Sequence, residues 1–271
     1  MLKFLSDEQL SNWKRDGAVW PIDLLTTAEV DDLTRRLEIL EASIGVEAQS
    51  KFRIKAHLPF PWLWDVIRNP RLADIIEDLL GPNIVCWGSS FFTKKPHDPR
   101  FVSWHQDSTY YGLKPPESIT AWVAFTPANE LSGCMRIIPG SHKGDAILPH
   151  EETFGKNNLL SRGQTILGID EDAAVEMPLK PGQISVHHNK TIHSSKPNKA
   201  DWPRVGFAIH FTTTDVYQTQ FANPLAIHIR GDDPEGNWIE DPYPEYELSP
   251  ASVKACEDYC KRYRSAMAAQ I

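Results

Sequence analysis

The sequence contains no long hydrophobic run. Within its 271 residues, eighteen consecutive apolar residues never occur, so no membrane-spanning helix is expected. The N-terminal stretch MLKFLSDEQLSNWKRDG turns charged at Asp7 and lacks the apolar segment of a secretory signal. Internal repeats and low-complexity tracts are also absent. These absences argue against membrane, secreted and repeat proteins.

Cysteine and positive charge are both scarce. Cys86, Cys134, Cys256 and Cys260 are too few and too scattered for a disulfide framework. Cys256 and Cys260 stand four residues apart on a predicted helix, but no second pair or nearby histidine completes a zinc site. We therefore predict a reducing, cytoplasmic compartment. The net charge of -8 and the pI near 5.7 argue against nucleic acid and acidic membranes as partners.

The remaining composition is that of one globular domain spanning residues 1–271, with 41% hydrophobic and 24% charged residues. Capping-box patterns at Ser6–Gln9 and Thr26–Glu29 predict two helix starts. A third helix is predicted from Pro70 to Leu80, with Gly81 ending it in a left-handed turn. These helices form a predicted N-terminal layer over residues 1–83.

From about residue 84 to 215 the pattern changes to short runs of β-branched and aromatic residues between Gly/Pro turns. This pattern predicts an all-β sandwich or barrel. The weakly periodic stretch 144–178 is long enough to be a lid or binding loop. Residues 216–271 are predicted to form an ordered coil, closed by a helix that Ser249 and Pro250 begin.

His105 and Asp107 stand two residues apart in FVSWHQDSTYYG, which we interpret as a strand. Alternate residues of a strand share a face, so both side chains would point the same way, away from Gln106. They are two of the three residue types of a 2-His-1-carboxylate iron site. His-x-acid pairs are weak signals, since roughly 1.3 are expected by chance here. A second pair begins at His150, in a predicted loop without a strand to aim it.

Several ordered motifs downstream make the pattern specific. Across residues 84–215 the chain resembles the phytanoyl-CoA dioxygenase family of Fe(II)- and 2-oxoglutarate-dependent oxygenases. The matching pieces are Trp104-His105-Gln106-Asp107, the stretch from Trp122 through Gly133-Cys134-Met135-Arg136, Pro139-Gly140-Ser141-His142, and His193-x-Ser195 followed by Arg204.

The resemblance implies a mainly β protein with flanking helices and a double-stranded β-helix (jelly-roll, cupin-like) core. It implies Fe(II) ligation by His105, Asp107 and His193. His187 and His188 compete for the third place, but the family pattern sets the ligand eleven residues before the arginine. It also implies that Arg204 clamps the distal carboxylate of 2-oxoglutarate, that Ser195 hydrogen-bonds it, and that Trp122 lies nearby.

The implied reaction is hydroxylation of an unactivated carbon with Fe(II), 2-oxoglutarate and O2, with ascorbate supporting it in vitro. Asp107 stands where halogenases carry a small residue, which favours hydroxylation over chlorination. The competing hypothesis is a jelly-roll protein that binds metal or a small molecule without turnover. Arg204 and Ser195 argue against it, because bare metal binding needs neither.

The sequence indicates less about the substrate. Tyr110 and Tyr111 directly follow the predicted ligand strand, and at least one should line the pocket unless both pack in the core. Basic residues lie before and around the core, where a solvated face is the ordinary interpretation: Lys51, Arg53, Lys55, His57, Lys94, Lys95 and Arg100. We predict substrate contacts from Tyr110, Lys55 and Arg53 to a small polar metabolite, such as an aminoethylphosphonate, with an acyl-CoA or other natural product as the alternative.

Overall fold

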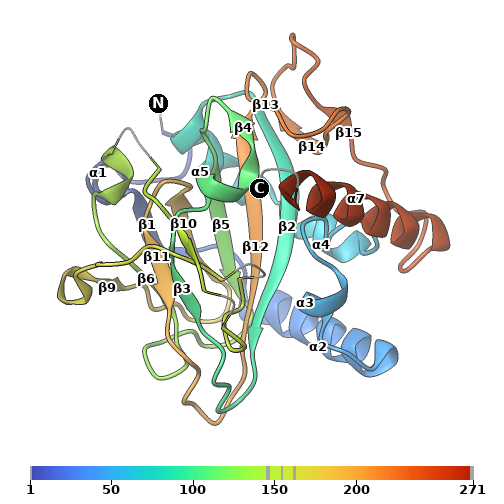
Figure 1. Ribbon diagram of the computed structural model, residues 1–271. Helices are drawn as coiled ribbons and strands as arrows, with labels where there is room; N and C mark the ends of the chain where they lie inside the picture. The colour runs from blue at the N-terminus through green and yellow to red at the C-terminus, as the bar shows by residue number, and fades with distance from the viewer. Residues whose placement is uncertain (1, 145–146, 154, 161–162, 269–271) are drawn as a thin grey trace.

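The computed structural model describes residues 2–144, 147–153, 155–160 and 163–268 (Figure 1). The predicted helix starts are confirmed. α1 (Asp7–Asp16) and α2 (Thr27–Ile44) both begin with complete capping boxes, each cap side chain contributing about 1 kcal/mol. α5 (Pro70–Leu80) also ends as expected at Gly81, whose φ of 90° favours glycine, although its ψ of -174° lies outside the left-handed helical region.

The N-terminal region is not purely helical, which corrects the prediction for residues 1–83. β1 (Ala18–Asp23) forms an edge strand of the main sheet, and Pro21 lies where its pairing register shifts. An edge tolerates proline because one side of the strand needs no hydrogen-bond donors. Two further helices, α3 (Ala48–Lys51) and α4 (Pro61–Ile67), complete this region.

The main sheet has seven strands, and the predicted runs at 84–94, 119–124, 183–188 and 204–213 all lie in it. Its neighbours are antiparallel except for the last pair. In spatial order the strands are β1, β10 (Gln183–His188), β5 (Ile119–Ala124), β12 (Arg204–Thr213), β2 (Ile84–Lys94), β14 (Leu225–Arg230) and β15 (Ile239–Glu240).

A smaller second sheet supplies the two predicted histidine ligands. Its order is β3 (Val102–His105), β11 (His193–Ser195), β6 (Met135–Ile137) and β9 (Val175–Glu176). Side chains from the two sheets meet, since the His187 ring of β10 lies 4.5 Å from the His193 ring of β11. This mainly β, two-sheet arrangement with flanking helices confirms the predicted jelly-roll fold class.

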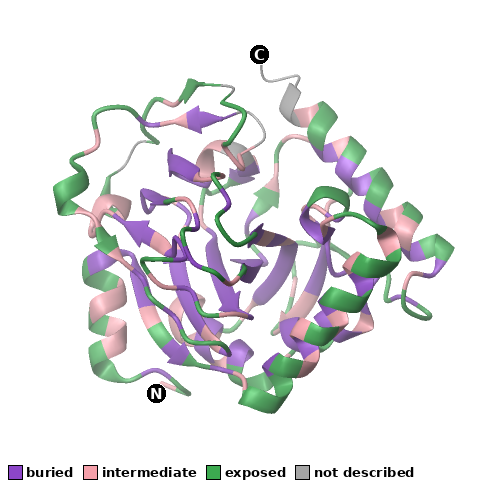
Figure 2. Cartoon of the chain, turned by 90° about the horizontal axis from the view of Figure 1, so that it is seen from below, coloured by how far each residue is buried: buried purple, intermediate pink, exposed green. Residues whose placement is uncertain are grey.

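Strand alternation decides which face of the main sheet packs on helices and which faces the second sheet. On β12, Phe207, Ile209 and Phe211 join a large apolar core with residues of α2, α4 and α5. Arg204, Ala208 and His210 lie on the opposite face and line a cavity. Burial of each large core side chain contributes about 1.5–3 kcal/mol, so the helix layer holds the sheet while its other face is left for chemistry. Figure 2 shows the buried strands enclosed by helices that are exposed on their outer sides.

The stretch between residues 144 and 178 contains short elements rather than one irregular loop. β7 (Glu151–Glu152) pairs with β8 (Gln164–Thr165), and the 3-10 helix η2 (Glu171–Ala173) precedes β9. A second 3-10 helix, η1 (Ser141–Lys143), comes just before this stretch. The described residues Glu152, Leu159 and Leu160 line the cavity.

The C-terminal region also differs from the predicted coil. β14 pairs with β2 inside the main sheet, so residues 225–230 were wrongly interpreted as coil. β13 (Tyr217–Gln218) pairs with β4 (Leu113–Lys114). The last helix, α7 (Pro250–Ala268), begins where predicted, and the Ser249 hydroxyl accepts a hydrogen bond from the Ser252 amide at 3.3 Å. Figure 1 shows α7 beside β2, on the same side of the sheet as α3 and α4.

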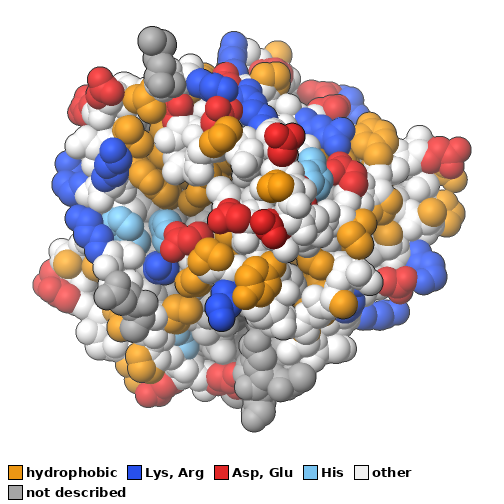
Figure 3. Space-filling model, turned by 90° about the horizontal axis from the view of Figure 1, so that it is seen from above, with side chains coloured by type: hydrophobic (Ala, Val, Ile, Leu, Met, Phe, Trp, Pro, Cys, Tyr) orange, Lys and Arg blue, Asp and Glu red, His pale blue; other side chains and the backbone are white. Residues whose placement is uncertain are grey.

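None of the described helices is long and apolar enough to cross a membrane. On the face seen in Figure 3, acidic and basic side chains are interspersed with scattered apolar ones.

Candidate functional site

His105 and His193 lie directly opposite each other on the paired strands β3 and β11. Their ring centroids are 4.0 Å apart. The Nδ1 atom of His105 lies 2.9 Å from the Ser103 carbonyl oxygen, and Nδ1 of His193 lies 2.9 Å from the Thr191 carbonyl oxygen. Because a carbonyl can only accept, each Nδ1 carries the hydrogen, and each neutral ring keeps its lone pair on Nε2.

Asp107 reaches the histidines by a different route from the one predicted. β3 ends at His105, and Asp107 lies in the right-handed helical region at the start of the short helix α6 (Ser108–Tyr111). Asp107 therefore lies close to His105 as predicted, but not because the two residues share a strand face. Its Oδ1 lies 3.4 Å from His105 Nε2 and 3.9 Å from His193 Nε2. Its Oδ2 accepts a hydrogen bond from Thr120 Oγ1 at 3.3 Å.

The donor set of this site fits a divalent transition metal. His105, Asp107 and His193 are buried and offer ligand atoms that all lie within 4.8 Å of one another. Burial opposes ionisation of Asp107, but the neighbouring imidazoles hold its pKa well below the usual range. Burial, and then His105 and His187, lower the pKa of His193 well below the usual value. A carboxylate and a neutral imidazole are the protonation states that metal binding requires.

Of the two competing histidines, His187 faces the site and His188 does not. His187 Nε2 lies 3.5 Å from Asp107 Oδ2, and in the described part of the chain neither buried ring nitrogen of His187 meets the criteria for a hydrogen bond. His188 instead contacts Glu117 through Nε2 at 2.9 Å. The alternation of β10 separates these adjacent residues.

Arg204 is buried in the same cavity. Its side chain is 3% exposed, and neither Nε nor Nη2 forms a hydrogen bond with the residues that the structure describes. Burial lowers its pKa to about 10. The guanidinium lies over the Trp122 ring, 5.2 Å from the centroid. A buried cation whose donors are unsatisfied is costly, so the site is suited to an anionic ligand.

Gly206 explains how Trp122 can lie against β12. A Cβ atom on Gly206 would be 1.8 Å from Cζ2 of Trp122. The glycine therefore leaves the space in which the indole packs, and the indole in turn supports Arg204.

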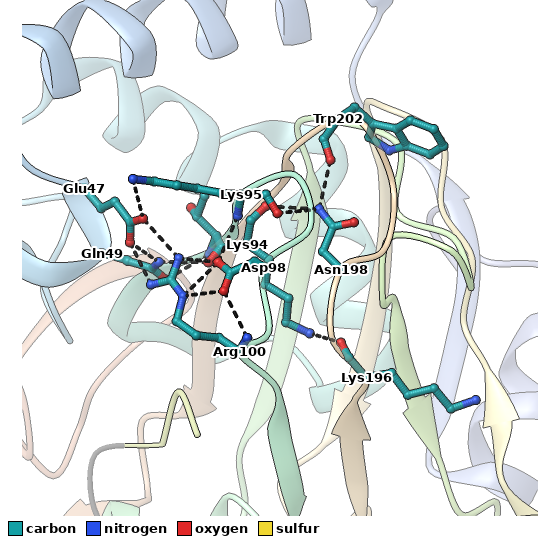
Figure 4. Close-up of polar contacts among 10 residues, drawn as sticks. Glu47, Gln49, Lys94, Lys95, Asp98, Arg100, Lys196, Asn198 and Trp202 are labelled. Atoms are coloured by element: carbon teal, nitrogen blue, oxygen red, sulfur yellow. Dashed lines mark hydrogen bonds and ion pairs between the residues drawn. The ribbon is translucent and has the colours of Figure 1, made fainter. Parts of the chain in front are cut away.

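Lys94 is a member of this site that sequence reasoning grouped with solvated basic residues. It is fully buried, and its Nζ donates to Ser195 Oγ at 2.7 Å and to the Lys196 carbonyl oxygen, a contact drawn in Figure 4. In the register of β2 and β12 it stands directly opposite Arg204. Burial and then Arg204 lower its pKa to about 6. Like charges directly across a sheet are unfavourable, so this pairing again calls for an anion. Finding Lys94 from the sequence would have required the correct pairing of β2 with β12, which lie far apart in the chain.

Other basic residues near Lys94 have acidic partners. Figure 4 shows Arg100 held by Glu47 and Asp98, with Nη1 2.8 Å from Glu47 Oε2 and Nε 2.9 Å from Asp98 Oδ1. Lys95 is exposed and pairs with Glu47 at 3.3 Å. Their charges are therefore largely neutralised.

The candidate metal and anion positions share a cavity of about 650 Å³. This is within the range of small-molecule sites. Tyr111 lines it and also packs against Trp87, with ring centroids 4.5 Å apart. His210 lines it too, hydrogen-bonded through Nδ1 to Thr120 Oγ1 at 3.0 Å, and burial lowers its pKa to about 4. The side chain of Tyr110 lies outside the described part of the structure.

The two predicted basic substrate contacts have different surroundings. Arg53 is half-buried and lines the cavity. Lys55 is fully buried, donates to Asp241 Oδ2 at 2.6 Å and to the Leu225 carbonyl oxygen at 2.7 Å, and is not among the cavity-lining residues. A second cavity of about 300 Å³ adjoins the first, and Arg53 and Arg100 line both.

Gln106 is not among the cavity-lining residues, as predicted, although it follows the end of β3 and does not lie in a strand. Its side chain donates to the Lys190 carbonyl oxygen at 2.7 Å and accepts from the Leu148 amide at 2.8 Å. Nε2 of His150 accepts a hydrogen bond from the Gln106 amide at 3.0 Å. His150 thereby supports the peptide between His105 and Asp107.

Fold and site together define a cupin-like protein with a candidate mononuclear metal centre beside an anion pocket. Residues 13–206 match the family described as phytanoyl-CoA dioxygenase (PhyH). The chain belongs to this family.

Curated relatives agree with the family at low identity. The chain is 26% identical over 164 residues to a probable phytanoyl-CoA dioxygenase of Caenorhabditis elegans, covering 58% of this chain and 52% of that protein. It is 28% identical over 163 residues to a probable alpha-ketoglutarate-dependent hypophosphite dioxygenase of Stutzerimonas stutzeri, covering 59% and 56%. The chain thus spans about half the length of these curated relatives.

Solved structures match over almost the whole chain. The apo form of ThoJ, described as a non-heme monooxygenase, aligns with a TM-score of 0.81 and 30% identity, covering 95% of this chain and 96% of ThoJ. CytC3 with Fe(II) and alpha-ketoglutarate aligns with a TM-score of 0.64 and 24% identity, covering 91% and 97%. At that identity the second match supports the fold alone.

Proposed function

We propose that this protein is an Fe(II)- and 2-oxoglutarate-dependent dioxygenase that hydroxylates an unactivated carbon of a small molecule. The observation that carries the proposal is one cavity lined by both a His105–Asp107–His193 donor set and a buried Arg204, whose Nε and Nη2 have no hydrogen-bond partner among the described residues. The named activities of the relatives support the same chemistry.

His105, Asp107 and His193 would hold Fe(II). When bound with 2-oxoglutarate, iron supplies the activation of O2 that hydroxylation requires. The Ser103 and Thr191 carbonyl oxygens orient the two imidazoles through their Nδ1 hydrogens. The Asp107 carboxylate brings the charge that favours a divalent cation, and Thr120 donates to its second oxygen. These contacts set the donor atoms in place before the metal binds.

Arg204 would clamp the distal carboxylate of 2-oxoglutarate with its planar fork. Ser195 Oγ, which accepts from Lys94, can turn its own hydrogen toward the same carboxylate. Trp122 closes the side of this pocket and excludes water from the ion pair. The carboxylate would pair with Arg204 and would favour the protonated form of Lys94, which stands opposite Arg204 and whose pKa is lowered to about 6.

For the substrate we propose a small anionic metabolite, with organophosphonates such as an aminoethylphosphonate as the first class to test. Arg53 in the cavity wall and the hypophosphite-oxidising relative support this choice. An acyl-CoA or another natural product is the alternative within the family. We also propose a reducing cytoplasmic location, supported by four buried free cysteines.

The test is an anaerobic titration with Fe(II) and 2-oxoglutarate, followed by a succinate assay with O2, ascorbate and a substrate panel. We expect a visible metal-to-ligand absorption band that needs both components, and succinate coupled to product. Arg204→Gln should lose the band at 2-oxoglutarate concentrations that saturate wild type. Binding of a panel member without any succinate would favour a non-catalytic jelly-roll binding protein.

A further inference from the structure

Besides Arg204, two further arginines line the cavity without an acidic partner in the described part of the chain. Arg53 follows α3, and Arg264 belongs to α7, more than two hundred residues later in the chain. Within the described part of the chain, neither forms an ion pair with an acidic side chain. Burial, and then the nearby charge of Arg264, lower the pKa of Arg53. Arg53 is half-buried and Arg264 is exposed, and both line the same cavity without an acidic partner among the described residues.

Acidic side chains also line this wall. Glu47 is one of them, but it is already bound to Arg100 and Lys95. Glu152 also lines the cavity and has its own interaction within the protein. Arg100 shows how this chain neutralises a structural arginine, since Glu47 and Asp98 both contact it (Figure 4). Lys55 is neutralised in the same manner by Asp241.

The backbone that carries Arg53 is strained and tightly held. Ile54 lines the cavity with φ 66°, a left-handed conformation that β-branched residues rarely adopt. Its amide donates to Ser90 Oγ at 3.1 Å, and its carbonyl oxygen accepts from the Ser89 amide at 2.6 Å. Such strain persists only where surrounding contacts over-determine it, and it is common at ligand clamps.

The last helix fastens the same segment from the other side. Cys260 Sγ donates to the Arg53 carbonyl oxygen at 2.7 Å, and Cys256 Sγ donates to the Lys55 carbonyl oxygen at 3.4 Å. The Arg53 side chain is further fixed by its Nε bond to the Gln49 carbonyl oxygen at 3.1 Å. Arg53 and Arg264 are thus brought to one wall by direct contacts between their elements.

The cavity that these arginines share with the candidate metal ligands has a largely apolar wall. It includes the side chains of Ile54, Trp87, Phe92, Tyr111 and Tyr263. A purely polar anion such as an aminoethylphosphonate would leave this surface uncovered, so the apolar wall narrows the proposed small anionic substrates to those with an apolar body. A ligand with an anionic end and an apolar or aromatic body would satisfy both parts of the wall.

We propose that Arg53 and Arg264 form the anion-recognition site for an amphipathic organic anion whose apolar body extends along the aromatic wall toward His105, Asp107 and His193. The anionic group is a carboxylate, phosphate or phosphonate, which the planar fork of arginine binds well. The identification of this ligand as the substrate rests on the proposed function. The binding of the ligand at this site does not depend on that function.

The experiment measures binding by calorimetry, anaerobically, with and without Fe(II) and 2-oxoglutarate. The probes are 2-phenylethylphosphonate and 3-phenylpropanoate, their uncharged analogue 2-phenylethanol, and methylphosphonate, which lacks the apolar body. We expect an aromatic anion to bind wild type at least about tenfold more tightly than 2-phenylethanol or methylphosphonate.

Arg53→Gln and Arg264→Gln should each weaken binding of the aromatic anion about tenfold, while Arg53→Lys should retain part of it. Lys261→Gln, an exposed position on the same helix, removes equal charge and should change binding less than twofold. Full affinity in the double variant Arg53→Gln/Arg264→Gln, or equal affinity of wild type for the charged and uncharged aromatic probes, would overturn the proposal.

The titration of Fe(II) and 2-oxoglutarate into the same variants separates this inference from the proposed function. We expect their affinities to remain within about twofold of wild type, since in the described structure neither arginine contacts Arg204, Lys94 or the metal-donor set, although all line or adjoin one cavity. Arginine-dependent binding of the aromatic anion, in a protein that binds no 2-oxoglutarate, would support this site and contradict the proposed function.

Discussion

The ammonium group of Lys94 lies 2.7 Å from the hydroxyl of Ser195, in a fully buried position opposite Arg204. Its pKa of about 6 in the folded protein contrasts with about 10.4 for an unfolded lysine. Between these values the unfolded chain binds more protons than the folded one. The free energy of unfolding should therefore rise with pH from about 6 upward.

We expect wild type to gain stability relative to Lys94→Met as the pH is raised from 6.5 to 9, and the difference to be constant below pH 6. Denaturant midpoints of the two proteins across this range would measure it. Bound 2-oxoglutarate should favour charged Lys94 and reduce the pH dependence. Parallel curves for the two proteins at all pH values would contradict the lowered pKa.

Asp107→Ala should remove metal affinity and coupled hydroxylation together. Mutating a residue that only hydrogen-bonds a metal-ligating side chain lowers metal affinity roughly 10–100-fold. Loss of the ligand Asp107 itself should lower metal affinity by more than this. Calorimetric titration with Co(II) measures affinity without turnover, and Glu151→Gln serves as an exposed acidic control. Retained hydroxylation by Asp107→Ala would show that another group completes the site.

Arg204→Lys keeps the positive charge but removes the planar fork. We expect the affinity for 2-oxoglutarate to fall about 30- to 150-fold, as for the loss of about 2–3 kcal/mol of charge-assisted hydrogen bonding. The metal affinity should be unchanged, because Arg204 is not a member of the donor set. An unchanged 2-oxoglutarate affinity would place the cosubstrate elsewhere.

Gly206→Ala should displace the Trp122 ring, since the added methyl would lie 1.8 Å from it. Overpacking of this kind costs about 1–3 kcal/mol of unfolding free energy. Affinity for 2-oxoglutarate should fall as well, because Arg204 lies over the displaced ring. Thermal unfolding and the anaerobic titration measure the two effects.

A double-mutant cycle provides the control for this effect. Replacing the indole with a smaller ring in Gly206→Ala/Trp122→Phe should recover part of the lost stability, giving a coupling energy of opposite sign to the single losses. Additive losses would mean that the methyl group acts on the backbone of β12 and not on the indole.

The sequence by itself determined the capped helices, most strands of the main sheet and the residue types of the candidate metal centre. Local signals suffice for these features, because capping boxes and period-two alternation depend on residues close in the chain. Three strands of the main sheet were missed: β1 carries Pro21, and β14 and β15 lie in a stretch rich in turn residues. Their pairing partners outweigh that local preference.

Only the tertiary structure decided which charged side chains face the cavity. Lys55 and Arg53 are equivalent by sequence, yet Asp241, 186 residues away, binds Lys55 while Arg53 remains in the cavity wall. Lys94 joins Arg204 through the register of two strands more than a hundred residues apart. Asp107 reaches the histidines through a turn into α6 and not along a strand face. Strand register, helix docking and long-range ion pairs place these groups, and no short stretch of sequence encodes any of them.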